Sequence, residues 1–206
     1  MRMRRTVSGS ELGQSIIETL LMMPLLLTLL LNAANFAYYF LMLVNLTASQ
    51  RSGTEYSIMG GATPAAIALP KTGPITNTGT VSYATYQDLT GAVYAPTTKG
   101  ALQICSPTSA AGIVNPGTTT ERTGCDYYGT KPAGFSWTNP HVDPELNNGS
   151  TAPAFLLNRT DVVYTFTPLI PGTPFNLALL LSPNCQSSGG NLSCYFHRYS
   201  EMRVMN

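Results

Sequence analysis

The segment Gly13-Gln14-Ser15-Ile16-Ile17-Glu18 directly precedes a long apolar run, Thr19 to Val44, and these two stretches decide the architecture expected for the chain. The run exceeds the ~20 apolar residues that an α-helix needs to cross a bilayer. No charged side chain occurs from Thr19 to Gln50, whereas Met1 to Arg5 contains three arginines. Because basic residues stay on the cytoplasmic side, the sequence predicts a single-pass inner-membrane helix with a cytoplasmic N-terminus and a periplasmic C-terminal domain.

The predicted helix continues beyond the apolar run to about Met59, where Gly60-Gly61 supplies a stop signal. A conventional secretory signal peptide is the competing interpretation of the same residues. Such a signal has an apolar region of about 7–15 residues before a cleavage site with small side chains. The run is roughly twice that length, although Asn32-Ala33-Ala34 offers small residues.

Four residues within the apolar run are candidates for helix packing. Pro24 is expected to kink the helix, which can help neighbouring membrane helices to pack. Thr28, Asn32 and Asn35 follow one another at spacings of four and three residues and therefore share one helical face. Two interpretations of this polar face stay open: hydrogen bonding to other helices, or contact with water near the outer membrane interface.

Glu18 is the residue of this region that most indicates a function. A carboxylate at the centre of a bilayer is unfavourable by roughly 2.5–3.5 kcal/mol on insertion scales. The combination of a basic leader, Gly13, Glu18 and an apolar helix around Pro24 resembles the N-terminal region of type IV pilin-like proteins. More narrowly, it resembles the TadE-like pseudopilins of the tight-adherence (Tad, type IVc) pilus system.

The resemblance covers the chain well to about residue 60 and loosely from about residue 162. The segments that carry it beyond the apolar run are Ala48–Tyr56, Val162–Pro171 and Met202-Arg203-Val204. The middle of the chain, about Thr63 to Ala154, resembles no family. Thr19-Leu20 also departs from the Glu-Tyr pair that the small major pilins carry after the glutamate, which favours a minor pilin.

The resemblance implies that a membrane-embedded prepilin peptidase cleaves the chain after Gly13 and leaves Gln14 with a free amine. Glu18 would then pair with this amine or with that of an adjacent subunit during assembly. The implied partners are other Tad pilins and pseudopilins, the inner-membrane assembly platform and membrane lipid. Without the resemblance, Glu18 is a glutamate favoured by the helix macrodipole, an effect of ~0.3–1 kcal/mol.

The expected domains are a leader (1–13), the helix (14–60) and an extracytoplasmic domain (61–206). Proline, glycine, threonine, serine and asparagine are frequent in the last of these, which is typical of turns and short strands. The fold class predicted is therefore α+β: one long helix and a small, loop-rich, mainly antiparallel sheet. Strands are expected at Thr80–Tyr86, Ala101–Cys105, Val162–Phe166 and Ser193–Val204, and Phe175–Leu181 fits a strand or a short helix.

The four cysteines, Cys105, Cys125, Cys185 and Cys194, all follow the apolar run. An even number of cysteines in an oxidising compartment predicts two disulfides, for which three connectivities are possible. Sequential pairing, Cys105 with Cys125 and Cys185 with Cys194, is favoured because it closes short loops. The absence of a Cys-x2-Cys motif and the presence of only two histidines argue against a zinc site.

No motif in the sequence indicates an enzyme, a cofactor or nucleic-acid binding. Charged residues make up 10% of the chain and form no basic stripe. His141, Asp143 and Glu145 alternate as metal ligands on a strand would, but Pro140 and Pro144 favour a solvated turn. Three functions stay open: a pilin-like subunit, an unprocessed membrane-anchored binding protein, and a subunit that forms a filament by itself.

Overall fold

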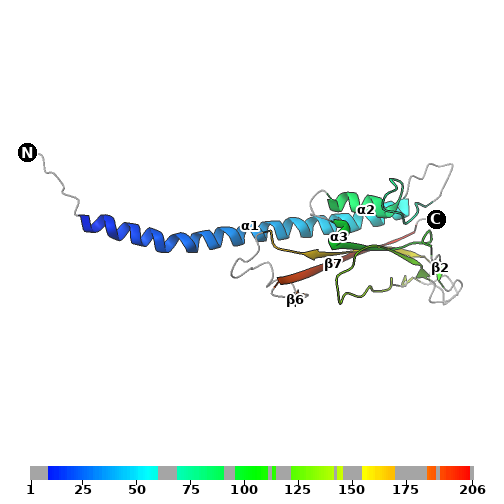
Figure 1. The fold of residues 1–206 in the computed structure, drawn as a ribbon. Coiled ribbons are helices and arrows are strands. Elements are labelled where there is room, and N and C mark those ends of the chain that lie inside the picture. Colours follow the sequence, from blue (N-terminus) through cyan, green and yellow to red (C-terminus); the bar gives the residue numbers. More distant parts are fainter. Residues whose placement is uncertain are drawn as a thin grey trace, which may run out of the picture.

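The computed structural model describes residues 9–59, 69–90, 96–110, 113–114, 122–141, 143–145, 155–169, 185–188 and 191–204. One long helix, α1 (Gly9–Met59), projects away from the rest of the chain in its first half and lies along a sheet in its second half (Figure 1). The other elements are α2 (Val81–Thr90), α3 (Pro96–Lys99), β1 (Gly100–Cys105), β2 (Ile113–Val114), β3 (Arg122–Thr123), β4 (Cys125–Gly129), β5 (Leu157–Phe166), β6 (Cys185–Ser188) and β7 (Asn191–Arg203).

Five of the strands form one antiparallel sheet in the order β4-β1-β5-β7-β6, and β2 pairs with β3. The central pair is the longest, with β5 and β7 in register from Leu157 opposite Arg203 to Phe166 opposite Cys194. An α+β fold with an apolar N-terminal helix and a small antiparallel sheet is thus confirmed. The predicted strands at Ala101–Cys105, Val162–Phe166 and Ser193–Val204 correspond to β1, the second half of β5 and β7.

The strand predicted at Thr80–Tyr86 is wrong, because this segment forms helix α2. Thr80 caps its start: the backbone N–H of Tyr83 donates to Thr80 Oγ1 at 3.3 Å. The buried side chains of α2 recur at helical spacing, at positions 81, 82, 85, 86 and 89. The alternation of Val81, Tyr83 and Thr85 fitted a strand equally well, and only the contact with α1 selects the helix.

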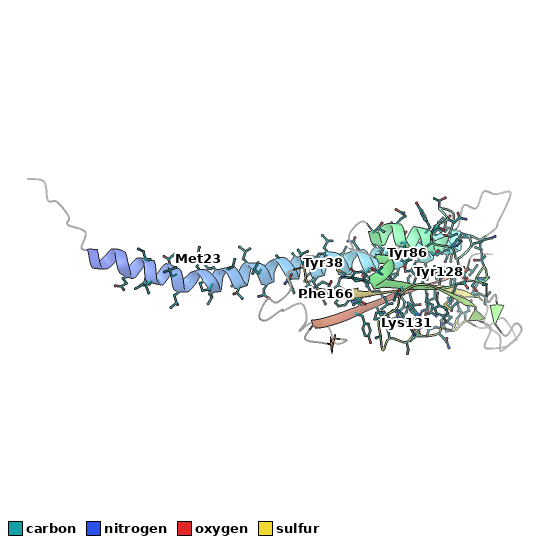
Figure 2. The ribbon with its side chains drawn as sticks, in the orientation of Figure 1. Met23, Tyr38, Tyr86, Tyr128, Lys131 and Phe166 are labelled. Atoms are coloured by element: carbon teal, nitrogen blue, oxygen red, sulfur yellow. A yellow bond between two sulfur atoms is a disulfide. The ribbon has the colours of Figure 1, made fainter. Side chains whose placement is uncertain are left out.

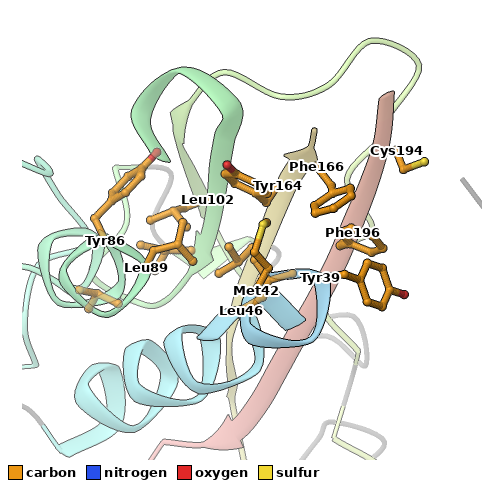
Figure 3. Close-up of a cluster of buried hydrophobic side chains, with 13 residues drawn as sticks. Tyr39, Met42, Leu46, Tyr86, Leu89, Leu102, Tyr164, Phe166, Cys194 and Phe196 are labelled. Atoms are coloured by element: carbon orange, nitrogen blue, oxygen red, sulfur yellow. The ribbon is translucent and has the colours of Figure 1, made fainter. Parts of the chain in front are cut away.

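The helix ends at Met59, as predicted, and the main core lies between the sheet and its second half (Figure 3). Tyr39, Met42 and Leu46 are buried at spacings of three and four, so they form one face of α1. The Tyr39 ring packs edge-on against Phe166 of β5 and Phe196 of β7, with centroids 5.8 and 5.2 Å apart. These contacts hold α1 across the central strands.

Gly53 allows α2 to approach α1 closely. A Cβ at this position would lie 2.2 Å from Thr85 Oγ1 and 3.2 Å from Thr160 Cγ2, and both of these residues are buried. Nearby, Ser49 Oγ donates to the backbone carbonyl of Thr85 at 2.9 Å. A side chain at position 53 would therefore separate the two helices.

The Cys105–Cys125 disulfide is confirmed and joins directly opposed residues of β1 and β4. Cys194 is also disulfide-bonded. The register of β6 and β7 places Cys185 opposite Cys194, as sequential pairing requires, but the Cys185 side chain lies outside the part that the structure describes. The segment Phe175–Leu181 also lies outside the described residues.

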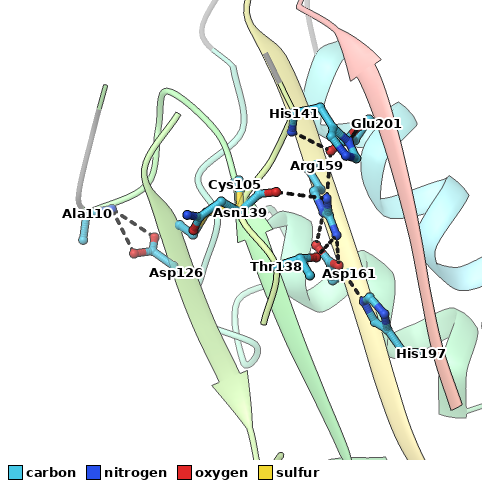
Figure 4. The surroundings of a disulfide bond; sticks show 11 residues. Cys105, Ala110, Asp126, Thr138, Asn139, His141, Arg159, Asp161, His197 and Glu201 are labelled. Atoms are coloured by element: carbon cyan, nitrogen blue, oxygen red, sulfur yellow. Dashed lines mark hydrogen bonds and ion pairs between the residues drawn. A yellow bond between two sulfur atoms is a disulfide. The ribbon is translucent and has the colours of Figure 1, made fainter. Parts of the chain in front are cut away.

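A segment of residues 130–141, the outer-face segment, covers the side of the sheet turned away from α1. Phe135 is buried against Ala101 of β1 and Val163 of β5. Further along the segment, Thr138 and Asn139 accept hydrogen bonds from the buried Arg159 of β5 (Figure 4). The sheet is therefore covered on both faces.

Candidate functional site

The first half of α1 exposes apolar side chains on all of its faces. Eleven large apolar residues between Ile16 and Leu30 are 57–72% exposed. They are Ile16, Ile17, Leu20, Leu21, Met22, Met23, Leu25, Leu26, Leu27, Leu29 and Leu30. A helix that is apolar all round is normally buried in protein or in a membrane. This half of α1 therefore requires a cover that the rest of the described chain does not supply.

The exposed half is shorter than the apolar run of the sequence. Residues 16–31 measure about 24 Å at ~1.5 Å per residue, compared with a hydrocarbon core of about 30 Å. From residue 32 onward one face of α1 is buried, and from Tyr39 it belongs to the domain core, so the predicted span Thr19–Val44 is divided between two environments. Of the described helices, α1 alone is long and apolar enough to cross a membrane.

The polar residues of the apolar run lie at the boundary between these environments. Thr28 is half-buried, and its Oγ1 donates to the Pro24 carbonyl at 2.8 Å. Asn32 donates from Nδ2 to the Thr28 carbonyl at 2.9 Å and is buried, and Asn35 is completely buried. Asn35 therefore meets neither another subunit nor water, the two interpretations left open by the sequence, because its own chain covers it.

Gly13 and Glu18 lie on the exposed half, near the start of α1. A Cβ added to Gly13 would meet nothing within 4 Å, so neither packing nor a tight turn requires glycine there. Glu18 is exposed, and its Oε1 accepts a hydrogen bond from Gln14 Nε2 at 3.4 Å. The bond between Gly13 and Gln14 lies inside the helix, which begins at Gly9.

A buried polar cluster on the outer face of the sheet was not predicted from the sequence. Arg159 Nε and Nη2 donate to both carboxylate oxygens of Asp161 at 2.6 and 2.7 Å, and Nη1 donates to Glu201 at 3.0 Å (Figure 4). His197 Nε2 lies 2.6 Å from Asp161 Oδ1. Burial acts to lower the pKa of Arg159, but hydrogen bonds and charges of Asp161 and Glu201 raise it above its ordinary value.

The arrangement of this cluster favours a structural role, because every charged group in it has a partner of opposite charge or a hydrogen-bond acceptor. Arg159 and Asp161 are both on the outer face of β5, and Glu201 faces Arg159 across the β5–β7 register. The alternation of polar residues along these strands was visible in the sequence. Which of these residues come into contact depends on the register of β5 and β7, and the sequence alone does not predict that register.

The residues considered as metal ligands are engaged with protein groups. His141 Nδ1 lies 2.7 Å from Glu201 Oε2, and Arg203 binds both Asp143, at 2.7 Å, and Glu145, at 2.8 Å. Across the residues that the structure describes, no three potential ligands lie close enough to share a metal ion. His141 instead attaches the end of the outer-face segment to β7, and Asp143 and Glu145 attach the residues that follow it.

Comparisons with known proteins identify no relative: no family model, no curated protein and no solved structure matches the chain.

Proposed function

We propose that the chain is a pilin-like subunit that is processed after Gly13 and takes part in assembling a Tad-type pilus. The observation that carries the proposal is the first half of α1, which exposes apolar side chains from Ile16 to Leu30 and has Gly13 and Glu18 near its start. Lateral packing among similar helices, or lipid before assembly, would supply the cover that this half lacks. The N-terminal resemblance to TadE-like pseudopilins is the reason for choosing this system.

Gly13 supports processing because nothing in the fold requires a glycine at this position. Glycine in a helix interior is less favourable than alanine by about 1 kcal/mol, and the space around Gly13 is open. Recognition by another protein explains the glycine at position 13. A peptidase that accepts only a small residue before the scissile bond would require it.

Glu18 supports assembly because its hydrogen bond from the neutral Gln14 side chain would not compensate its negative charge if the carboxylate were buried. In the exposed part of the helix its carboxylate accepts a hydrogen bond from the Gln14 side chain at 3.4 Å. When helices pack side by side, its carboxylate leaves water and requires a cation. The amine created on Gln14 by cleavage, in the same chain or an adjacent subunit, is the cation that processing provides.

Intact mass spectrometry of the protein purified from its host's membranes tests the processing step. We expect a mass that begins at Gln14. A full-length mass would contradict processing and favour the second candidate, a membrane-anchored binding protein in which the same apolar half serves only as an anchor. A chain starting near Phe36 would indicate an ordinary signal peptide.

Replacing Glu18 with alanine tests the assembly step. We expect E18A to insert into the membrane normally, while pili are lost or shortened in electron micrographs of the host. The matched control is E55A, which removes an exposed carboxylate from the packed half of α1 together with its 2.9 Å ion pair to Arg51. Normal pili in E18A would contradict the role of Glu18. Abundant protein in sheared surface material would indicate that it forms a filament itself.

A further inference from the structure

A pocket of about 390 Å³ opens between the edge strand β4 and the outer-face segment. Its lining residues are Ala101, Tyr127, Tyr128, Gly129, Lys131 and Trp137, of which Tyr128 and Lys131 are labelled in Figure 2. This volume falls within the range of small-molecule sites, about 300–1,000 Å³. The pocket is far from Gly13 and Glu18 along the chain and is not required by the pilus proposal.

Trp137, which forms the aromatic wall of the pocket, is fixed in place by packing against a buried ring. Trp137 packs edge-on against Phe135, with centroids 4.9 Å apart and an interplanar angle of 88°. Phe135 is itself buried against Ala101 of β1 and Val163 of β5. A turn brings it there: the Phe135 N–H donates to the Pro132 carbonyl at 3.2 Å, and Gly134 adopts a φ of +76° that favours glycine.

Arg159 fixes the chain immediately after Trp137. Its Nη1 donates to the Asn139 carbonyl at 3.3 Å, and its Nη2 donates to Thr138 Oγ1. Because Arg159 is itself locked by Asp161, the wall is positioned before any ligand arrives. A preformed site avoids the loss of conformational entropy that weakens binding by mobile segments.

Lys131 supplies the charge at this pocket. It is exposed and forms no ion pair with any residue that the structure describes. The nearby acidic groups of the outer face are already bound, Asp161 and Glu201 by Arg159 and Asp143 by Arg203. The cation therefore remains available to an anionic group of a ligand.

The exposed Tyr127 ring and the half-buried Trp137 ring define the shape of the ligand. Tyr127 is 58% exposed, and its ring centroid lies 6.1 Å from that of Trp137 at an interplanar angle of 39°. The rings are too close and too inclined to hold a flat base between them, but their outer faces form an angled apolar floor. A puckered sugar ring places C–H groups against such a floor and directs its hydroxyls towards the polar rim.

We propose that this pocket binds a sugar ring that carries a carboxylate, as in a uronic acid unit of an acidic polysaccharide. Tyr127 and Trp137 contact the C–H face of the ring, and Lys131 binds the carboxylate. Arg159 is a positioning residue, because it holds the wall and does not touch the ligand. The site would give the outer domain a direct contact with an acidic glycan.

Tryptophan fluorescence tests the proposal, because Trp137 is the only tryptophan in the chain. The full chain in detergent micelles is titrated with tetragalacturonate, and we expect a saturable change. K131M should weaken this binding about tenfold, the effect of losing a charge-assisted hydrogen bond. K71M removes an equally exposed lysine that does not line the pocket and should leave binding unchanged.

Three results would overturn the proposal. The first is the absence of a saturable change, and the second is equal affinity for tetragalacturonate and an uncharged galactose tetramer. The third is tighter binding of a short oligothymidylate, which would assign the pocket to nucleic acid. Y127A should abolish the fluorescence response, and circular dichroism verifies that this variant folds. If Y127A does not fold, K131M still tests the site, because Lys131 is exposed. None of these outcomes depends on cleavage after Gly13.

Discussion

The two halves of α1 both contain many large apolar residues, but these residues are exposed in the first half and partly buried in the second. The first half exposes leucine, isoleucine and methionine on every face, whereas the second half buries Tyr39, Met42 and Leu46 on one face. The second half also buries small polar residues, among them Ser49 and Thr54, whose hydroxyls donate to backbone carbonyls. Apolar content alone therefore does not tell which part of a long helix belongs to a domain; the distribution of polar residues around the axis does.

Truncating one leucine in each half should give the largest contrast in stability. Leu46 is 1% exposed in the main core, and Leu26 is 63% exposed. L46A should lower the free energy of unfolding of the domain by about 2–5 kcal/mol, because it leaves a cavity. L26A should change it by less than ~0.5 kcal/mol. Urea unfolding of the full chain in micelles, monitored at Trp137, measures both; equal losses would contradict the division of α1.

Raising the pH should weaken the domain core against which the second half of α1 packs, and not the exposed half. Burial raises the pKa of Tyr86 from 10.0 to about 12, and burial also raises the pKa of Tyr164. Because the neutral phenol is favoured in the folded state, its contribution is complete below pH ~10 and is lost as the pH rises towards ~12. For Tyr86 this amounts to at most ~3 kcal/mol.

Y86F should remove that part of the alkaline loss while keeping the ring in the core. The measurement is the free energy of unfolding at pH ~9 and ~12 for both proteins. The exposed half of α1 contains no tyrosine between Ile16 and Leu31, so it contributes nothing to this loss. An identical pH dependence in Y86F and the parent chain would assign the loss to other groups.

Adding a single methyl group at each of two glycines should separate the halves again. G53A places a Cβ 2.2 Å from Thr85 Oγ1 and should destabilise the domain by roughly 1–3 kcal/mol, since both helices are confined there. G13A meets open space and should not destabilise the domain. Thermal unfolding of the two variants gives the comparison, and a G53A variant as stable as the parent would show that α2 moves away without penalty.

Replacing Pro24 with alanine should produce the smallest effect. Proline inside a soluble helix is unfavourable by ~3 kcal/mol, but Pro24 lies in the exposed half, away from the core. The free energy of unfolding of the domain should therefore change by less than ~0.5 kcal/mol. Helical content, measured by circular dichroism, should rise slightly. A large gain in domain stability would show that the proline strains the packed half.

Local patterns were sufficient to predict much of the fold. The end of α1 followed from the apolar run and Gly60-Gly61, and the second half of β5 followed from β-branched and aromatic residues. Strand β7 followed from the alternation of Cys194, Phe196 and Arg198. The Cys105–Cys125 pairing followed from loop length. Each of these features depends on residues that are near one another in the sequence.

Features that depend on distant contacts could not be predicted. The alternation at Val81, Tyr83 and Thr85 suited a strand, and only packing against Ser49 and Gly53 of α1 explains the helix. Where α1 enters the core was hidden for the same reason, since its buried face is defined by β5 and β7. The Arg159 cluster and the aromatic pocket need the register of the sheet and the turn at Gly134.

The continuity of α1 has a mechanical consequence. The helix contains 51 residues, about 77 Å at ~1.5 Å per residue, and its second half runs lengthwise along the sheet (Figure 1). A tension applied to its first half reaches the domain with no intervening linker. The load acts as shear along the interface, so the side chains of Tyr39, Met42 and Leu46 must slide past β5 and β7 together before the helix detaches. A force on the first half of the helix is therefore transmitted directly to the sheet through these packed side chains.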